Sequence, residues 1–417
     1  MKRASTVDES SGLEEPLLDS STSAARVRQW LADLEFLDWL AVALLAAGGL
    51  AVATGLLPRA SASASVSRIA PLLLFLAAVI VLAELAAGAE LFDVIATRLT
   101  IVARGSTVVL FTLCVAFAAV TTMFLNLDTT AVLLTPVLLA TATRAGVNRL
   151  ALAMTTVWLA NTASLLLPVS NLTNLLAANR VRLGPLAFAA RMALPQVAAL
   201  LVVAGCLWLF YWRTNDRRYA PPGPHRPADR VLFRGAAVAC ALFVAGVLLD
   251  LPIAAVSTVS AAVLAGVYLW RRRRDLRPGL IPWRLLVFVT GLFLVVDTIG
   301  RHGLSDWMSV LIGADPGRTG IVRAATTGGL LSNVFNNLPT YVAGEAVVPS
   351  GNHDQLLALL IGTNVGPLIT PWASLATLLW AERCRAAGVT IRWGRFVLTG
   401  AVVATLVLVA SVAALLV

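Results

Sequence analysis

The sequence predicts an all-α polytopic membrane protein with two inverted-topology repeats, each containing a re-entrant hairpin and a broken transmembrane helix. Composition is the first reason: 59 % of the 417 residues are apolar, 13 % are charged and the mean hydropathy is +0.84, far from the balance of a soluble domain. Second, runs of about 20 apolar residues, enough to cross a roughly 30 Å hydrocarbon core, recur from residue 37 to the end. Third, the two halves of the chain resemble each other.

The apolar runs divide into full spans and interrupted regions. Each interrupted region has polar residues in its middle, so it is either two ordinary spans or a re-entrant hairpin, and both options return the chain to its starting side. Two amphipathic segments, near 90–104 and 301–314, predict helices at the membrane surface. The full spans are 37–57, 69–88, 149–176, 186–212, 231–250, 252–270, 282–300, 353–381 and 394–417, and the interrupted regions are 106–143 and 319–350.

Arginine placement predicts the orientation. The Arg-rich loops at 211–230, 271–277 and 382–395 fall on one face of this topology, which is the cytoplasmic face by the positive-inside rule. We therefore expect a multi-pass protein of the plasma (inner) membrane, with the N-terminus in the cytoplasm and the C-terminus outside. Four arginines fall on the outer face against the rule: Arg59, Arg68, Arg180 and Arg182.

A fixed offset of 203 residues relates the halves, and it pairs Asn161 with Asn364, Pro168 with Pro371, Asn171 with Ser374 and Asn174 with Thr377. In this topology the first interrupted region starts and ends on the cytoplasmic side, and the second starts and ends on the outer side. The repeats are therefore inverted. Secondary transporters use such repeats to place a substrate site near the bilayer midplane. The predicted division is a mobile cytoplasmic tail (1–36), a first transmembrane repeat (37–212), a cytoplasmic linker (213–230) and a second repeat (231–417).

The first interruption, "FLNLDTTAVLLTP", contains four candidate site residues. Non-helical backbone inside hydrocarbon needs a protein or water partner, and a helix that starts there directs free N–H groups into the gap. The carboxylate of Asp128 is the least ordinary group, because it costs about 2.5–3.5 kcal/mol at this depth. Its alternative role is to cap the next helix. The candidates are Asn126, Asp128, Thr129 and Thr130.

The second interruption, "SNVFNNLPTYVAGE", predicts the opposing tip with Asn336, Asn337 and Thr340. Its alternative is ordinary amide bonding between helices. Each repeat then supplies a broken span, "ANTASLLLPVSNLTN" and "TNVGPLITPWAS", in which prolines release carbonyl groups at mid-span. An ordinary proline kink would not need Asn171 and Asn174 as well.

Three buried acids are candidates for proton coupling: Asp128, Asp297 and Glu345. Asp297 has an alternative role as an interfacial partner of Arg301, and Glu84 is a weaker candidate of the same kind. The chain has no phosphate-binding loop, no metal-ligand motif and no hydrolase motif. We therefore expect no enzyme activity and no cofactor, and the arginines in short loops argue against nucleic-acid binding.

These segments, together with "IGTNVGPLITPWASLATLLW", resemble the signature segments of the arsenite permease (arsenical pump membrane protein) family of the ion transporter superfamily, which is related to sodium/dicarboxylate and citrate carriers. The resemblance covers about residues 40 to 417 and implies export of arsenite or antimonite, driven by a proton gradient or by the membrane potential. It also implies that the hairpin tips and the broken helices line the site. The broken-helix groups are Asn171, Thr173, Asn174, Asn364 and Ser374.

The predicted function is secondary active transport, with export of arsenite or antimonite as the first candidate. The alternative is a carrier of another small anion, such as a dicarboxylate, citrate or an inorganic oxyanion, coupled to sodium or protons. The candidate partners are the substrate anion or neutral hydroxide, a coupling H+ or Na+, the lipid membrane, a cytoplasmic ATPase subunit and a second copy of the chain. Scattered cysteines suit a carrier that must release trivalent arsenic, because thiols bind it tightly.

Overall fold

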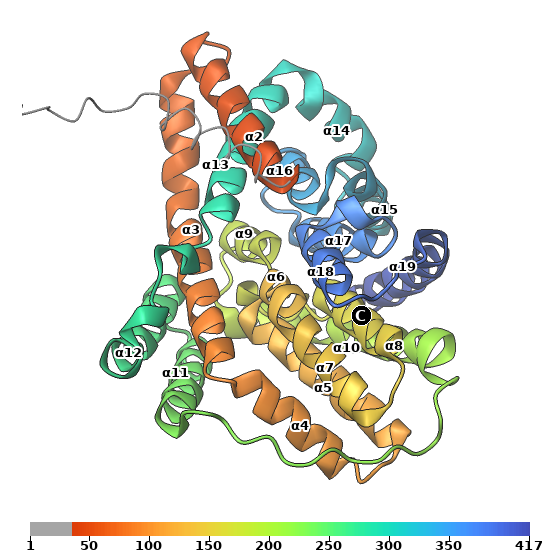
Figure 1. The fold of residues 1–417 in the computed structure, drawn as a ribbon. Coiled ribbons are helices and arrows are strands. Elements are labelled where there is room, and N and C mark those ends of the chain that lie inside the picture. Colours follow the sequence, from red (N-terminus) through yellow and green to blue (C-terminus); the bar gives the residue numbers. More distant parts are fainter. Residues whose placement is uncertain (1–35) are drawn as a thin grey trace, which may run out of the picture.

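The first half of the chain forms a bundle of helices that are interrupted at several points. The structure is a computed structural model, and it describes residues 36–417 (Figure 1). The predicted tail lies outside the described residues, apart from Phe36, where the first helix begins. The helices of this half are α2 (Phe36–Ala53), α3 (Arg59–Gly88), α4 (Leu91–Val102), α5 (Thr107–Leu125), α6 (Leu127–Thr129), α7 (Thr135–Ala145), α8 (Arg149–Thr162), α9 (Leu172–Val181) and α10 (Pro185–Leu207).

The second half repeats this order with one additional long helix at its start. Short helical turns join several helices in both halves: π turns at Thr130–Leu134, Trp208–Trp212 and Gly300–Leu304, and 3₁₀ turns at Pro168–Ser170, Arg273–Asp275, Pro278–Leu280, Gly366–Leu368 and Pro371–Ala373. The helices are α11 (Arg230–Leu248), α12 (Ile253–Arg271), α13 (Trp283–Ile299), α14 (Ser305–Ile312), α15 (Arg318–Phe335), α16 (Asn337–Val347), α17 (His353–Val365), α18 (Leu375–Ala386) and α19 (Trp393–Leu415).

The predicted fold class is confirmed: the described residues form helices and no strand, and seven helical segments are long and apolar enough to cross a membrane. These segments are Arg59–Gly88, Thr107–Leu125, Pro185–Trp212, Arg230–Leu248, Ile253–Arg271, Trp283–Ile312 and Trp393–Leu415. The chain is therefore a multi-pass membrane protein.

Both interrupted regions turn at an asparagine. Asn126 ends α5 with φ 73° and ψ 166°, and Asn336 ends α15 with φ 81° and ψ 156°. This region of the backbone map is occupied almost only by glycine, and another residue there costs about 1–3 kcal/mol. The same uncommon conformation at both tips indicates that the break, and not a continuous helix, is the required structure.

Both predicted broken spans contain a stretch without continuous helix. Residues 163–171 separate α8 from α9, and residues 366–374 separate α17 from α18. Polar side chains on neighbouring helices take up the released backbone groups. The Gln196 amide of α10 accepts from Leu165 N–H at 2.9 Å and donates to Thr162 O at 2.9 Å, while Asn333 of α15 accepts from Thr370 N–H at 3.0 Å and donates to Gly366 O at 3.0 Å.

Helix contacts correspond between the two halves. α2 packs on α13 and α3 packs on α12, while α4 contacts α7 and α14 contacts α16. The short helices α4 and α14 lie at opposite ends of the molecule (Figure 1). An inverted repeat that pairs α2 with α12 and α3 with α13 makes the α2–α13 contact equivalent to the α3–α12 contact, in agreement with these observations. The inverted relation and the domain boundaries stay predictions.

Small residues bring α15 of the second hairpin into close contact with α17 of the second broken span. A Cβ built on Gly362 would overlap the Ala325 carbonyl, and one built on Gly366 would overlap the Gly329 carbonyl. Backbone therefore meets backbone at this crossing, as is common between membrane helices. The hairpin and the broken helix of the second half are consequently held together closely.

The segment 213–230, the predicted linker, is attached to α4 and to the residue before it. Tyr219 donates its hydroxyl hydrogen to Thr100 O at 2.6 Å, and the ring of His225 contacts the Glu90 carboxylate at 2.6 Å. Ser106 and Arg218 form an isolated antiparallel bridge. The segment 213–230 is thus an ordered strap across α4 and the start of α5.

Candidate functional site

The four breaks meet at a small chamber of about 40 Å³ between the two hairpin tips. The start of α6 approaches from the first hairpin, the start of α16 from the second, and the starts of α9 and α18 close the sides. Amides, a hydroxyl and one carboxylate provide its polar lining, and no arginine or lysine is among the lining residues. The polar lining residues are Asp128, Asn171, Asn336, Asn337 and Ser374.

The tip asparagines hold the breaks open by capping the helices that follow them. Asn126 Oδ1 accepts from Thr129 N–H at 2.9 Å, and Asn336 Oδ1 accepts from Leu338 N–H at 3.4 Å, a donor that Asn337 Oδ1 shares at 2.8 Å. Asn336 also donates its amide to Trp372 O at 2.9 Å, which connects the second tip to the broken stretch after α17. These bonds satisfy backbone groups that hydrocarbon would leave without a partner.

The threonines at the two tips play different parts. Thr130 donates to Asn126 O at 2.9 Å, and Thr340 donates to Asn336 O at 2.7 Å, so both stabilise a tip from within. The hydroxyl oxygen of Thr129 is buried without a hydrogen-bond partner among residues 36–417, and Thr129 lines a larger adjoining cavity. Thr129 is therefore the tip threonine with hydrogen-bonding capacity to offer a solute.

Asn364, the last asparagine of α17, joins the two broken helices. Its Oδ1 accepts from Asn171 Nδ2 and from Thr173 Oγ1, both at 2.9 Å, and its Nδ2 donates to Asn174 Oδ1 at 2.8 Å. All four side chains are buried. Four of the five broken-helix residues that the resemblance grouped together thus form one hydrogen-bonded cluster across the halves, and Ser374 lies outside it.

The equivalent cluster on the other side is less complete. Asn161, which pairs with Asn364 in the repeat, donates to Thr377 Oγ1 at 3.3 Å, and Thr377 is the repeat equivalent of Asn174. Among the described residues, the Oδ1 of Asn161 and the hydroxyl of Ser374 are buried without a hydrogen-bond partner. Since buried polar groups are rarely left unpaired, the hydroxyl of Ser374, which lines the chamber, and that of Thr129 are available to a bound solute. Asn161 lines neither space.

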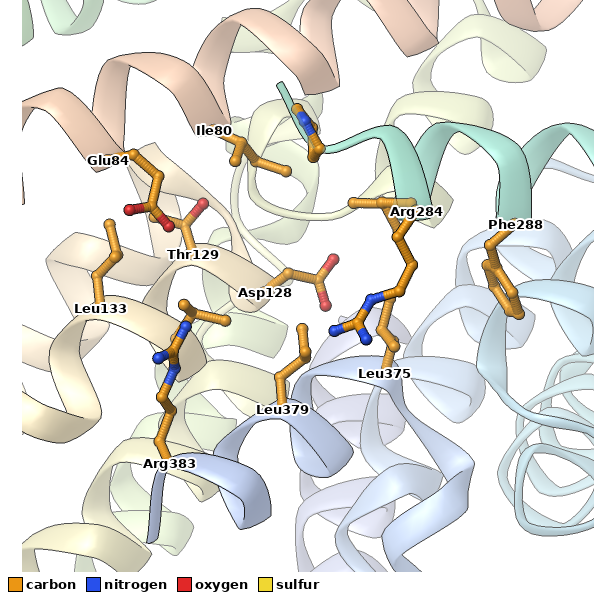
Figure 2. Close-up of a pocket in the computed structure, with 13 residues that line it drawn as sticks. Ile80, Glu84, Asp128, Thr129, Leu133, Arg284, Phe288, Leu375, Leu379 and Arg383 are labelled. Atoms are coloured by element: carbon orange, nitrogen blue, oxygen red, sulfur yellow. The ribbon is translucent and has the colours of Figure 1, made fainter. Parts of the chain in front are cut away.

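A cavity of about 220 Å³ adjoins the chamber and lies toward the C-terminal end of α3; Figure 2 shows the side chains that line it. Figure 2 shows the carboxyl groups of Glu84 and Asp128 and the guanidinium groups of Arg284 and Arg383 directed into it. Aliphatic and aromatic side chains form the rest of its wall, including Ile80, Leu133, Phe288 and Leu379. We call it the inner cavity, because Arg284 and Arg383 adjoin the loops that the topology places in the cytoplasm.

A second cavity of about 390 Å³ opens at the opposite end, and we call it the outer cavity. Arg68 of α3 forms an ion pair with Glu345 of α16 at 2.7 Å. Asp297 accepts from Ser65 Oγ at 2.9 Å and pairs with Arg301 at 3.4 Å, as the interfacial alternative for Asp297 expected. These contacts join the N-terminal half of α3 to the second hairpin and to α13.

The chamber adjoins the inner cavity and is separate from the outer one. Chamber and inner cavity share Asp128, Leu285, Phe288 and Leu375, whereas no residue lines both the chamber and the outer cavity. Asp128 is the single acid at the junction.

The sequence-derived candidates fall into three places. The chamber is lined by Asp128, Asn171, Asn336, Asn337 and Ser374. The tips and the Asn364 cluster contain Asn126, Thr129, Thr130, Thr340, Thr173, Asn174 and Asn364. The outer cavity is lined by Asp297 and Glu345. Sequence reasoning did not select Arg284, Arg383 or Gln196. The signal for Arg383 was present, since it lies 203 residues after Arg180.

Comparisons with known proteins agree with this architecture. The profile of the citrate transporter family (CitMHS) matches residues 34–354. An arsenical pump membrane protein of Escherichia coli is 32 % identical over 367 residues, which are 81 % of this chain and 84 % of that protein. Another from Yersinia enterocolitica is 33 % identical over 326 residues, 72 % of this chain and 74 % of that protein.

A solved structure has a similar fold. The crystal structure of the YdaH transporter of Alcanivorax borkumensis, described as having an unusual topology, superposes with a TM-score of 0.52 at 14 % identity, covering 91 % of this chain and 96 % of that one. At this identity the likeness concerns the fold alone.

Proposed function

The chain belongs to the family of citrate transporters and arsenical pump membrane proteins, and from this premise we propose that it exports arsenite and antimonite, driven by a proton gradient or by the membrane potential. The family is one of secondary transporters in the membrane. The substrate, its direction and the energy coupling are the proposed part.

The amide and hydroxyl lining of the chamber, in which Asp128 is the one ionisable group, is the observation that carries the substrate proposal. Asn336, Asn337 and Ser374 offer amide and hydroxyl groups, and the lining contains no arginine or lysine. Arsenous acid is neutral near pH 7 and has three hydroxyl groups, so it needs donors and acceptors but no opposite charge. A dicarboxylate would need stronger positive compensation than helix N-termini alone provide.

Thiol placement supports release of the cargo. Cys114, Cys206 and Cys384 are buried, Cys240 is partly buried, and none of them lines the chamber or either cavity. Trivalent arsenic would bind thiols tightly, whereas oxygen and amide contacts exchange easily. The proposed site therefore binds its cargo weakly enough to let it go.

Asp128 is the proposed coupling residue. It lies between the chamber and the inner cavity, where a proton and a hydroxide substrate would compete for the same carboxylate. Asp297 and Glu345 are the second choices, because they belong to the outer cavity and have arginine partners in this state.

The test is arsenite uptake into everted membrane vesicles that contain the protein, with and without an imposed proton gradient. We expect gradient-dependent accumulation in the wild type and its loss in Asp128→Asn, while Asp306→Asn, an exposed acid of α14, keeps it. Equal membrane abundance of the variants is the control. If intact protein accumulates no arsenite but takes up citrate with sodium, the alternative substrate class replaces the proposal.

A further inference from the structure

The two cavities share a feature that the repeat explains. Arg383 lies in the last turn of α18 and lines the inner cavity, and Arg180 lies in the last turn of α9 and lines the outer cavity. The two positions are 203 residues apart, the same offset that pairs Asn161 with Asn364. The repeat thus places one arginine at each mouth of the path.

Neither arginine forms a contact that stabilises the described fold. Among the described residues, Arg180 and Arg383 have no hydrogen bond and no ion pair, and both are solvent exposed. Their neighbours Arg68, Arg284 and Arg301 differ in this respect, since each has a carboxylate partner: Glu345, Asp38 and Asp297. The guanidinium groups of Arg180 and Arg383 are therefore available to bind a solute that enters the inner or the outer cavity.

Each free arginine faces a carboxyl group without touching it. Arg383 and Glu84 of α3 line the inner cavity together, and Arg180 and Glu345 of α16 line the outer cavity together. Glu84 makes no hydrogen bond among the described residues. Glu345 uses one oxygen for Arg68, while its Oε2 and the hydroxyl of Tyr341, one turn earlier on α16, are buried without a partner in the described part of the chain. Each mouth thus has unused donors opposite unused acceptors.

This pairing of groups selects for a particular kind of solute. A guanidinium group only donates hydrogen bonds, and an ionised carboxylate only accepts them. A neutral hydroxide fits between them, because its oxygens accept from the arginine while its O–H groups donate to the carboxylate. A polycarboxylate would satisfy the arginine but would be repelled by the acid, which lies in the same small space.

We propose that the Arg383–Glu84 pair and the Arg180–Glu345 pair are two docking sites for a neutral inorganic trihydroxide, one at each mouth of the transport path. The inference rests on the proposed function and deepens it, because it assigns a binding site on each side of the central chamber. It also gives Arg180 a reason to lie on the predicted outer face, against the positive-inside rule.

The experiment measures the apparent KM for arsenite separately from each face, using labelled arsenite in everted vesicles and in right-side-out vesicles. We expect Arg383→Gln to raise the KM from the inner face about ten-fold or more, as for loss of a hydrogen bond to a charged group, and to leave the KM from the outer face unchanged. Arg180→Gln should do the reverse. Arg385→Gln and Arg182→Gln are matched controls, since these exposed arginines line neither cavity.

A second readout tests the selectivity argument. Glu84→Gln should raise the KM for arsenite from the inner face and make citrate a stronger inhibitor there, because a repelling charge is removed. An unchanged KM for arsenite at the opposite face shows that each variant is folded and inserted.

Two results overturn the inference in different ways. If the wild type transports arsenite but Arg383→Gln and Arg180→Gln behave like their controls, or alter both faces equally, the docking sites are wrong while the proposed function stands. If the wild type transports no arsenite from either face, the proposed function fails, and the trihydroxide is removed as the occupant of both sites.

Discussion

The Asn364 cluster predicts unequal effects at two positions that the repeat makes equivalent. Asn364→Ala removes three hydrogen bonds, at 2.9, 2.9 and 2.8 Å, that join the halves. Asn161→Ala removes one such bond, at 3.3 Å, a bond within α8 to Val157 O at 2.9 Å, and an oxygen that has no partner among the described residues. The volume lost is identical, so the difference between the two variants isolates the polar contacts.

The magnitude follows from the number of bonds. Hydrogen bonds between membrane helices contribute about 0.6 kcal/mol each on average, so Asn364→Ala should lose about 2 kcal/mol and Asn161→Ala no more than about 0.6 kcal/mol from this source. Asn171, Thr173 and Asn174 would also be left with unpaired buried groups, which can increase the first value. The expected gap between the variants is therefore at least about 1 kcal/mol.

The assay is the free energy of unfolding in mixed detergent micelles titrated with dodecyl sulfate, followed through the exposure of the cysteines to a thiol-reactive dye. Three of the four cysteines are buried in the folded state and the fourth is partly buried, so labelling reports unfolding. Equal destabilisation by the two substitutions, or a larger effect of Asn161→Ala, would refute the reasoning that the asymmetric cluster holds the halves together.

Three further predictions concern stability, and the first two can be checked with the same assay. Gly362→Ala should destabilise by about 1–3 kcal/mol, because its Cβ would overlap the Ala325 carbonyl, whereas Gly266→Ala, with open space around it, should have no such effect. Asn336→Ala should be less stable than Asn336→Gly, because only glycine adopts φ 81°, ψ 156° without strain; equal stability would show that the tip relaxes. Hydrogen bonds from Leu232 N–H and Val231 N–H, with Arg271 nearby, hold the pKa of the Asp229 carboxyl below its ordinary 3.8. A lowered folded-state pKa contributes stability that is fully present above the ordinary pKa and is lost as the pH falls through the folded-state pKa. Asp229→Asn should therefore remove this loss of stability at acid pH, measured as a pH series of unfolding temperatures.

The breaks in the helices could be predicted from the sequence because they depend on local chemistry. Asn126 and Asn336 stand out in apolar runs, and Pro168 and Pro371 coincide in the repeat. The cavities could not be predicted in the same way. Arg284 and Arg383 come from α13 and α18, and only the packing of these helices around the first hairpin brings the two side chains into one space.

Polar residues in spans were also hard to rank from the sequence. Gln196 and Asn333 satisfy the backbone of the broken stretches, but each looks like any amide in a membrane helix. Glu345 was selected for its depth, yet no local pattern indicated Arg68 as its partner, because 277 residues separate them. Long-range pairs of this kind are decided by topology and not by local pattern.

The bonds of Asn364 have a consequence for biosynthesis. Asn171, Thr173 and Asn174 receive their partner from a residue 190–193 positions later in the chain. At a translation rate of about 5–20 residues per second, the partner is made roughly 10–40 s after them. During this interval the first broken helix lies in the bilayer with unpaired amides, so the nascent first half requires water, lipid headgroups or an insertion factor to shield it until the second half arrives.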